Sequence, residues 1–371
     1  SPGLDGVDAV VFDEFHERSL TSDVTLGLMR SLQERRPDLR LVVMSATLDA
    51  EAVCRYLGGC PHLHADGRLY PIETRYAERP ASLEVWDDAA RAAAALVREG
   101  GDGDLLVFLP GVYEIQRAME SCRRLLGNVD ILPLYGDLPP DIQHRVMEPG
   151  PRRRVILATN IAETSLTVPG VRHVIDSGLA RLGRHDAGRG ITLLELTPIS
   201  RDAADQRAGR AGREAPGTCS RLWTLAEQQR KPSRTAPEVQ RVDLAEAVVL
   251  LAALEAGDPA SFGWFEPPNP DSLSLVVTEL RDLGLIEARG FRLTALGREV
   301  SGVPAHPRLG RLLYAAAREG CLEDAAVAAA LLGERPVVRS GVELKPGAGL
   351  QSDLLAIVDL VRDAHAAGFR R

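Results

Sequence analysis

Residues 104–126 read DLLVFLPGVYEIQRAMESCRRLL, and this stretch decides the fold class of the chain. The apolar run that opens it, LLVFL, has the length of a buried strand. Ile115, Met119, Cys122 and Leu126 then recur at helical spacing, and we expect this face to pack on a sheet. A buried strand that leads into an amphipathic helix predicts a parallel sheet with crossover helices.

The same alternation of strands and helices fills much of the chain and falls into two series that divide near residue 78. We therefore predict an α/β fold with two parallel sheets facing a shared cleft. The first series has predicted strands at 7–12, 40–44 and 72–76 and helices at 21–35 and 49–57. The second series adds helices at 84–98 and 139–146 and strands at 129–134, 154–159 and 171–176.

The pattern changes beyond residue 176. Gly188 and Gly190 stand between two alternating segments, which predicts a β-hairpin over 180–196. A small winged-helix module is suggested by helices at 244–254 and 273–283 and short strands at 285–287 and 291–293. Further helices are predicted at 308–318, 323–332 and 352–365, with a loop at 346–349.

Four domains follow from these boundaries. The first is one α/β domain and the second is a further α/β domain. A winged-helix-like module and a helical domain come after them. The predicted ranges are 1–78, 79–236, 237–305 and 306–371 in that order.

The composition argues against some classes of protein. The 371 residues carry a net charge of −8, with a pI near 5.6. This acidic balance argues against general electrostatic binding of nucleic acid but leaves room for a local basic channel. No apolar run approaches the ~18 residues that a membrane span needs, so we expect no membrane association. The five cysteines include no CxxC pair, and they fit a reducing, cytoplasmic location.

Cys60, His62 and His64 place three possible metal ligands at alternate positions, which would share one face of a strand. No fourth ligand stands nearby in the sequence. A strand with ordinary polar side chains is therefore the favoured interpretation, and a metal site is the alternative.

Residues 206–213 read QRAGRAGR and give the strongest functional signal. Arginine carries a permanent charge and a planar fork that matches phosphate oxygens. Gly209 and Gly212 would allow the backbone to approach a ligand closely. A solvated helix face would normally mix in lysine or acids and would not need glycines, so a merely basic surface helix is the less favoured alternative.

Two further signals lie upstream of this run. The predicted strand at 7–12 ends in the carboxylates Asp13 and Glu14, a place suited to a hydrated magnesium ion bound to phosphates. The next strand ends in Ser-Ala-Thr at 45–47, which can also be a simple N-cap of the following helix. The three signals in this order and spacing are hard to obtain by chance.

Together these residues resemble the DEAH-box branch of superfamily 2 helicases, from its second motif onward. Phenylalanine replaces the alanine that names the branch, and with HERSL at 16–20 this resembles the bacterial HrpB type. The resemblance implies two RecA-like domains, the first incomplete, followed by the winged-helix module and a helical bundle. The matching segments are Asp13–His16, 45–47, Phe108–Gly111, Ala158–Thr167, Gln206–Arg213, 307–309 and 352–355.

The resemblance implies NTP hydrolysis, with ATP or another NTP and Mg²⁺ as cofactors. Asp13 and Glu14 would hold the Mg²⁺ ion through water, and Glu14 would also polarise the attacking water. His16 would bridge toward Gln206, which would help to orient the same water. The implied catalytic residues are Asp13, Glu14, His16, Gln206, Arg210 and Arg213.

Arg210 and Arg213 would be the arginine fingers that stabilise charge on the γ-phosphate. They belong to the second series and the carboxylates to the first, so hydrolysis would require closure, which would convert chemistry into motion along a strand. Where the family often has an aromatic residue and an acid, this chain has Met147 and Pro169, which leaves the base and ribose contacts open. The implied cofactor-binding residues are Thr159, Glu163, Met147 and Arg207.

Single-stranded nucleic acid is the partner that the resemblance implies, with RNA favoured over DNA. Backbone N–H groups and hydroxyls suit sequence-independent binding of strand phosphates. Ser45 and Thr47 would link the nucleotide state to the grip on the strand, and the 180–196 hairpin would act as a wedge. The implied nucleic-acid-binding residues are Ser45, Thr47, Pro110, Gly111, Asn160 and Thr164.

The sequence contains no phosphate-cradling Gly-x-x-x-x-Gly-Lys-Ser/Thr motif, and its only lysines are Lys231 and Lys345. We therefore expect a fragment of a larger helicase that is nearly inactive alone. One alternative is a non-catalytic nucleic-acid- or protein-binding module derived from a helicase. A metal-dependent nuclease built on Asp13, Glu14 and His16 is less favoured, because it would leave the paired arginines without a nucleotide to stabilise.

Overall fold

The computed structural model describes residues 3–46, 49–65, 67, 70–80, 82–163, 166–186, 190–333 and 352–368. Contacts within the chain group the residues into two compact units. The first, called here the sheet unit, contains residues 9–18 and 41–242. The second, called the helical unit, contains residues 1–8, 19–40 and 243–371.

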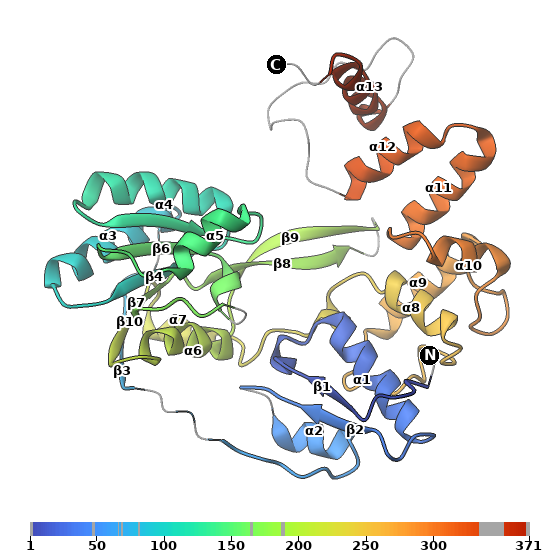
Figure 1. Ribbon diagram of the computed structural model, residues 1–371, viewed down its shortest axis with the longest axis horizontal. Helices are drawn as coiled ribbons and strands as arrows, with labels where there is room; N and C mark the ends of the chain where they lie inside the picture. Colours follow the sequence, from blue (N-terminus) through green and yellow to red (C-terminus); the bar gives the residue numbers. More distant parts are fainter. Residues whose placement is uncertain are drawn as a thin grey trace. The chain divides into compact units, whose positions relative to one another are not determined.

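The sheet unit is built around a six-stranded sheet in which every pairing is parallel (Figure 1). This confirms the α/β fold and the parallel sheet predicted from the sequence. The central strands β4 and β6 are buried at every position, as expected where both faces are covered. In spatial order the strands are β3 (Ile72–Tyr76), β10 (Gly217–Arg221), β7 (Val171–Asp176), β4 (Asp104–Phe108), β6 (Arg154–Ala158) and β5 (Asp130–Leu134).

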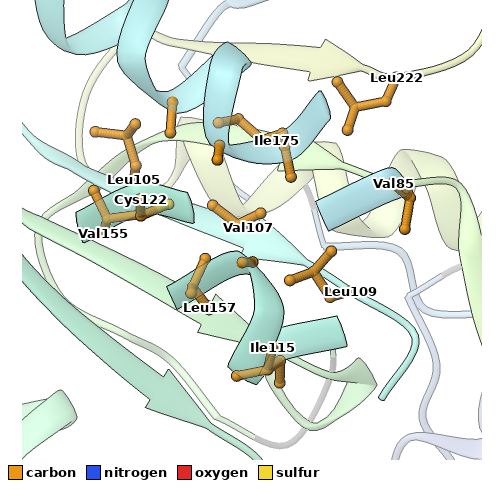
Figure 2. Packing of buried hydrophobic residues seen from close by; sticks show 14 of the residues in the cluster. Val85, Leu105, Val107, Leu109, Ile115, Cys122, Val155, Leu157, Ile175 and Leu222 are labelled. Atoms are coloured by element: carbon orange, nitrogen blue, oxygen red, sulfur yellow. The ribbon is translucent and has the colours of Figure 1, made fainter. Parts of the chain in front are cut away.

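One face of this sheet is covered by α3 (Val85–Glu99) and α4 (Val112–Leu125), whose side chains pack on it in Figure 2. Alternate residues of a strand point to opposite faces, so Leu105 and Val107 of β4 reach this side. The four residues predicted to form the sheet-facing stripe of the following helix all pack in this cluster, two of them fully buried. The stripe is therefore confirmed.

The opposite face receives Leu106 and Phe108 of β4, which pack with Val146 of α5 (Pro140–Met147) and with α6 (Arg201–Gly209). Full burial of such a side chain stabilises the fold by about 1.5–3 kcal/mol relative to exposure. The sheet is thus covered on both sides by elements of its own unit.

Strand β3 corrects one expectation. The alternation of elements placed residues 72–76 in the first series, but β3 pairs in parallel with β10, from Ile72 with Gly217 to Tyr76 with Arg221. It is therefore the edge strand of the second sheet. The sequence did not predict β10, because strand pairing joins residues far apart and leaves no local signal.

The other two strands of the first series, β1 (Ala9–Phe12) and β2 (Arg40–Val43), form a separate two-stranded sheet. The Met44 N–H donates to the Phe12 carbonyl at 2.7 Å. These strands are less well covered than β4 and β6, since Val11 is 54% exposed and Val42 is 42% exposed.

Helix α2 (Ala50–Tyr56) follows β2, as predicted. The strand expected around Cys60 to His64 is absent, since residues 60–65 have no regular secondary structure. Two glycines with positive φ, Gly58 and Gly59, turn the chain directly after α2, and Pro61 lacks the N–H that a ladder needs. This prediction was wrong.

The predicted hairpin over 180–196 is confirmed. Strands β8 (Leu179–Asp186) and β9 (Ile191–Pro198) pair antiparallel over their whole length (Figure 1). Residues 187–189, which include one of the two glycines of the predicted turn, lie outside the described residues. The sheet unit also contains α7 (Leu225–Arg230), which begins with a capping box formed by Thr224 and Glu227.

The helical unit contains the predicted helices, but its predicted short strands need a correction. The short strands expected at 285–287 and 291–293 are reduced to one antiparallel bridge between Ile286 and Leu293. The winged-helix module therefore stays a prediction, and the loop expected at 346–349 lies outside the described residues. The helices are α1 (Leu20–Gln33), α8 (Ala245–Ala253), α9 (Pro270–Asp282), α10 (Ala295–Ser301), α11 (Pro307–Glu319), α12 (Leu322–Gly333) and α13 (Asp353–Ala366). Among the described residues, no helix combines the length and the apolar character that crossing a bilayer requires.

Candidate functional site

The QRAGRAGR run forms the end of α6 and the following 3₁₀ turn, η3 (Arg210–Gly212). Ala204, Arg207, Ala208 and Ala211 are buried at helical spacing, so one face of this segment belongs to the core. The sequence interpretation treated the whole run as ligand-facing. The structure instead divides it into an anchored face and a face that carries the remaining arginines.

Arg207 anchors the run at the carboxyl end of β7. Its side chain is 1% exposed, and its Nε donates to Glu163 and its Nη1 to Asp176, each at 2.9 Å. Burial disfavours the charged form of Arg207, but Asp176 and Glu163 outweigh this effect and raise its pKa. The guanidinium also lies over the ring of Phe108, 4.9 Å from its centre. These contacts favour an anchoring role over the nucleotide contact predicted for Arg207.

Glu163 takes part in the same anchor. Burial raises the pKa of its carboxyl, and the nearby Arg207 offsets part of that rise. Its carboxylate is committed to Arg207, so a contact of the Glu163 side chain with nucleotide stays a prediction. Asp176 was missed at the sequence level, although the same signal that singled out Asp13, a carboxylate at the end of a buried strand, also applies to it.

Arg210 and Arg213 both reach the segment that follows η2 (Asn160–Ala162). Arg210 Nη1 donates to the Leu166 carbonyl at 3.0 Å and its Nη2 donates to the Glu163 carbonyl. Arg213 donates to the Thr167 hydroxyl. The run is therefore positioned against the segment expected to lie near phosphates.

The charge of Arg210 is electrostatically unfavourable in this position. Burial and the neighbouring charge of Arg213 lower the pKa of Arg210 to about 10, while Glu14 and Glu163 act in the opposite direction. The group stays charged at neutral pH. A buried cation beside a second cation indicates a place suited to an anion.

The two glycines of the run have different surroundings from those expected. A Cβ at Gly212 would lie 2.7 Å from the Tyr70 carbonyl, whereas a Cβ at Gly209 would meet nothing within 4 Å. Tyr70 N–H also donates to the Gly212 carbonyl at 2.9 Å. Gly212 thus permits a close approach of backbone to backbone, not to a ligand.

The carboxylates Asp13 and Glu14 stand in a short loop after β1. Asp13 Oδ1 accepts the Glu14 N–H at 2.8 Å, and Glu14 has φ of 50°, a left-handed conformation that is strained for this residue type. The loop is held by Phe15, which is 1% exposed and whose N–H donates to the Met44 carbonyl at 3.0 Å. Phe15, which stands where the DEAH motif has alanine, therefore anchors this loop.

His16 lies beside Glu14, with 3.4 Å between Nδ1 and the carboxylate oxygen. Its Nε2 is buried and has no hydrogen-bond partner among the described residues. The predicted bridge from His16 to Gln206 would satisfy this nitrogen, and it stays a prediction.

Asp13 and Glu14 fit a hydrated magnesium ion. Both side chains are exposed, so a cation with its water shell has access to them. No group of three or more His, Cys, Asp or Glu side chains that could hold a metal occurs in the described part of the chain, which includes Cys60, His62 and His64. An ion at Asp13 and Glu14 would therefore keep water or phosphate oxygens as most of its ligands.

Residues predicted to contact a strand gather at the carboxyl edge of the six-stranded sheet. Pro110 and Gly111 follow β4, and Thr159 and Asn160 follow the neighbouring β6. Asn160 is exposed, whereas Pro110 and Gly111 are buried. Ser45 is exposed after β2, and Thr47 and Thr164 lie outside the described residues.

A further ion pair at this edge was missed by the sequence analysis. Arg181 of β8 donates to both carboxylate oxygens of Glu114 in α4, at 2.7 and 2.9 Å. A Cβ at Gly111 would collide with Arg181 Nη1, so a larger residue at this position would force the arginine of the pair to shift. The pair fixes the base of the β8–β9 hairpin beside Pro110 and Gly111.

The two positions that depart from the family pattern are part of the packing. Met147 ends α5 and is partly buried against the cluster that contains Phe108. The Pro169 carbonyl accepts from Arg154 Nη2 at 2.6 Å. Contacts of Met147 or Pro169 with a nucleotide stay open.

Comparison with known proteins identifies relatives. Residues 88–215 match the family described as "Helicase conserved C-terminal domain". The chain is 38% identical over 373 residues to the ATP-dependent RNA helicase HrpA of Escherichia coli K12, covering 95% of the chain and 28% of HrpA. It is 39% identical over 339 residues to the ATP-dependent RNA helicase HrpB of the same strain, covering 90% of the chain and 42% of HrpB. It is also 38% identical over 334 residues to the pre-mRNA-splicing factor ATP-dependent RNA helicase prp22 of Schizosaccharomyces pombe, covering 87% of the chain and 28% of prp22.

Solved structures show the same relationship. One crystal structure of E. coli HrpB, a DExH-box NTPase, matches with a TM-score of 0.81 and 38% identity over 91% of the chain and 42% of HrpB. A second, of the DEAH/RHA helicase HrpB, matches with a TM-score of 0.84 and 35% identity over 99% of the chain and 47% of HrpB. The chain spans less than half the length of each relative. It is homologous to a segment of the DEAH-box RNA helicases, and its six-stranded sheet is RecA-like.

Proposed function

We propose that this chain, a homologue of the DEAH-box helicases, is the part of an NTP-driven nucleic-acid helicase that supplies the arginine fingers and the strand-separating hairpin. The observation that carries the proposal is the pair Arg210 and Arg213. Arg210 is buried, donates to the carbonyls of Glu163 and Leu166, and lies beside a second cation, which together with burial lowers its pKa to about 10. Such a pair is suited to the charge that develops on a transferred phosphoryl group.

The residues of the chain would divide the work of hydrolysis. Glu14 would accept a proton from the attacking water, and Asp13 would orient the water shell of the magnesium ion. Arg210 and Arg213 would stabilise negative charge on the phosphoryl oxygens, and Arg207 would keep both in position through Glu163 and Asp176. Bound Mg²⁺ would neutralise part of the triphosphate charge.

Single-stranded RNA is the proposed partner. Asn160 is exposed at the carboxyl edge of the sheet, next to Pro110 and Gly111, and polar groups there suit sequence-independent phosphate binding. The β8–β9 hairpin exposes Leu194 by 71% and Leu196 by 52%. Apolar side chains on a projecting hairpin can insert between bases, so the hairpin would act as the wedge. The free cysteines support a reducing, cytoplasmic location.

Magnesium-dependent NTP hydrolysis is the direct test. The chain alone should turn over almost no ATP, because it contains no phosphate-cradling motif. A longer protein that joins this chain to such a motif should be active and stimulated by single-stranded RNA more than by DNA. Strong ATP turnover by the 371 residues alone, abolished in Glu14→Gln, would contradict the expected dependence on a phosphate-binding loop.

A non-catalytic binding module is the second candidate, favoured by the same lack of a phosphate-cradling motif. It predicts that the chain binds a fluorescent RNA oligonucleotide as tightly without nucleotide as the longer protein does with it. It also predicts that Arg210→Ala changes nothing but this binding. RNA-stimulated hydrolysis in the longer protein that is lost in Arg210→Ala would exclude this candidate.

A further inference from the structure

We propose that Cys54 and Cys60 form a redox-sensitive thiol pair, a modification site at the end of α2 that closes reversibly into an intrachain disulfide. The two Sγ atoms lie 3.4 Å apart. Both residues are free cysteines with partly exposed side chains, so an oxidant has access to them. The proposal does not depend on the proposed function.

The backbone at the end of α2 brings the thiols together. The Gly59 N–H donates to the Cys54 carbonyl at 2.7 Å, and the Gly58 N–H donates to the Arg55 carbonyl at 3.1 Å. These are the two hydrogen bonds of a Schellman motif, and Gly58, with φ of 79°, provides its left-handed residue. The motif reverses the chain, so the next residue, Cys60, returns beside the last turn of the helix. Local structure alone therefore brings the sulfur atoms of two cysteines six positions apart into contact.

The other cysteines are differently placed and serve as internal controls. Cys122 and Cys219 are buried, and burial raises their pKa values to about 11 and about 12 respectively. Both therefore stay protonated and shielded from solvent. Cys321 is exposed but belongs to the helical unit, whereas the thiol pair belongs to the sheet unit.

The two sulfurs of the pair differ from each other. The Cys60 thiol donates its hydrogen bond to the sulfur of Cys54. Burial raises the pKa of Cys60, and the hydrogen bond to Cys54 acts in the same direction. The raised pKa of Cys60 keeps its proton in place at neutral pH, which suits it to react second.

A peroxide is the oxidant class that this chemistry requires. The sulfur of Cys54 attacks one peroxide oxygen, the O–O bond breaks, and a sulfenic acid and one water are formed. The sulfur of Cys60 then attacks the Cys54 sulfur, the S–O bond breaks, and a second water leaves with the Cys60 proton. Two thiols lose two electrons to the peroxide, and a dithiol reductant reverses the reaction by exchange.

The bond would form at the C-terminal end of α2, which begins at Ala50 and is capped at its other end by Asp49. It would fix the Schellman turn to the last turn of the helix. The disulfide is therefore placed to alter how far the end of α2 can fray, and not the buried sheet.

Peptide mapping of the intact chain tests the proposal. The chain is treated with hydrogen peroxide, blocked with iodoacetamide and digested with trypsin without reduction. Cleavage after Arg40, Arg55 and residue 68 places the two cysteines on separate peptides, 41–55 and 56–68. We expect these peptides to appear joined, with the mass of two hydrogens lost, and to separate after dithiothreitol treatment.

Variants give the matched controls. Cys60→Ser should abolish the joined peptides and leave a sulfenic acid at Cys54 that dimedone traps, whereas Cys321→Ser should leave the joined peptides unchanged. Peroxide treatment that oxidises Cys321 while peptides 41–55 and 56–68 stay fully alkylated would overturn the proposal. So would joined peptides of equal yield in the Cys60→Ser chain. Because the main measurement uses the unaltered chain, a folding defect in a variant does not affect it.

Discussion

The six-stranded sheet holds a buried arginine at each of its two ends, and the chain uses them differently. At the amino end, Arg154 is 2% exposed and pairs with Asp104 at 2.6 Å, and its remaining N–H groups donate to three backbone carbonyls. At the carboxyl end, Arg207 is 1% exposed and pairs with Glu163 and Asp176. Arg154 completes the packing at the end of the sheet where the strands begin. Arg207 anchors the QRAGRAGR run, which carries two more arginines.

The difference teaches how a structural arginine is distinguished from a functional one. Arg154 and Arg207 each have a carboxylate at hydrogen-bond distance, so their charges are balanced within the protein. Arg210 donates to the carbonyls of Glu163 and Leu166, lies beside the charge of Arg213, and has a pKa lowered to about 10 by burial and by Arg213. A buried cation whose charged form is disfavoured in this way is a candidate for binding an external anion.

The largest expected effect concerns Arg210, the proposed arginine finger whose pKa is lowered. In a longer protein that joins this chain to a phosphate-binding loop, Arg210→Ala should lower NTP turnover ~10³-fold or more, as expected for an arginine finger. That corresponds to about 4 kcal/mol of transition-state stabilisation. Steady-state kinetics at saturating RNA would measure it. Near-normal turnover in this variant would remove Arg210 from the mechanism and end its distinction from the structural arginines Arg154 and Arg207.

Arg207→Ala should have the largest effect on stability. Removing the guanidinium leaves the fully buried Asp176 and the partly buried Glu163 as unpaired carboxylates, which costs about 3–5 kcal/mol. Urea unfolding of the isolated chain would measure the loss. Arg213→Ala is the matched control from the same run, and because Arg213 is exposed it should change stability by less than about 0.5 kcal/mol. Equal stability of the two variants would contradict an anchoring role for Arg207.

Arg154→Ala tests the amino end and should cost somewhat less, about 2–3 kcal/mol, because it removes the partner of one carboxylate, Asp104, whereas Arg207→Ala removes the partner of two. The same unfolding experiment applies. Its NTP turnover per folded molecule in the longer protein should stay normal, unlike that of Arg210→Ala. A ~10³-fold loss of turnover here would show that the two ends of the sheet do not divide structure from chemistry.

The smallest effect concerns the hairpin base. Burial alone would raise the pKa of Glu114, but its hydrogen bonds with Arg181 prevail and lower it below the ordinary value of 4.5. A carboxylate with a lowered folded-state pKa stabilises the fold above its unfolded pKa and loses that contribution as pH falls through the folded value. Glu114→Gln should therefore cost about 1–2 kcal/mol at pH 7 and less below pH 4.5. Urea unfolding at both pH values would measure it, and a cost independent of pH would argue against a charge-based pair.

The local sequence was sufficient to predict most of the helices and strands. The apolar run of β4 and the stripe of α4 predicted a buried strand and its covering helix, because burial periodicity is a local property. The hairpin followed from alternation around two glycines. The Asp13–Glu14 pair and the QRAGRAGR run were found for the same reason, since each motif is contiguous.

Pairings between distant residues could not be predicted in this way. β3 was assigned to the wrong sheet, because its partner β10 lies 145 positions away and parallel strands carry no register signal. The strand expected around Cys60 was wrong, because two glycines and a proline after α2 turn the chain. The carboxylates that balance Arg207 are separated from it by 44 and 31 positions.

The sequence by itself determined the α/β class, the hairpin and the residues whose chemistry suits phosphates, since these depend on periodicity and on contiguous side chains. Tertiary structure alone decided which arginine anchors the run. A guanidinium group pairs with whichever carboxylate the fold brings within about 3 Å, and the fold brings Asp176 and Glu163 to Arg207.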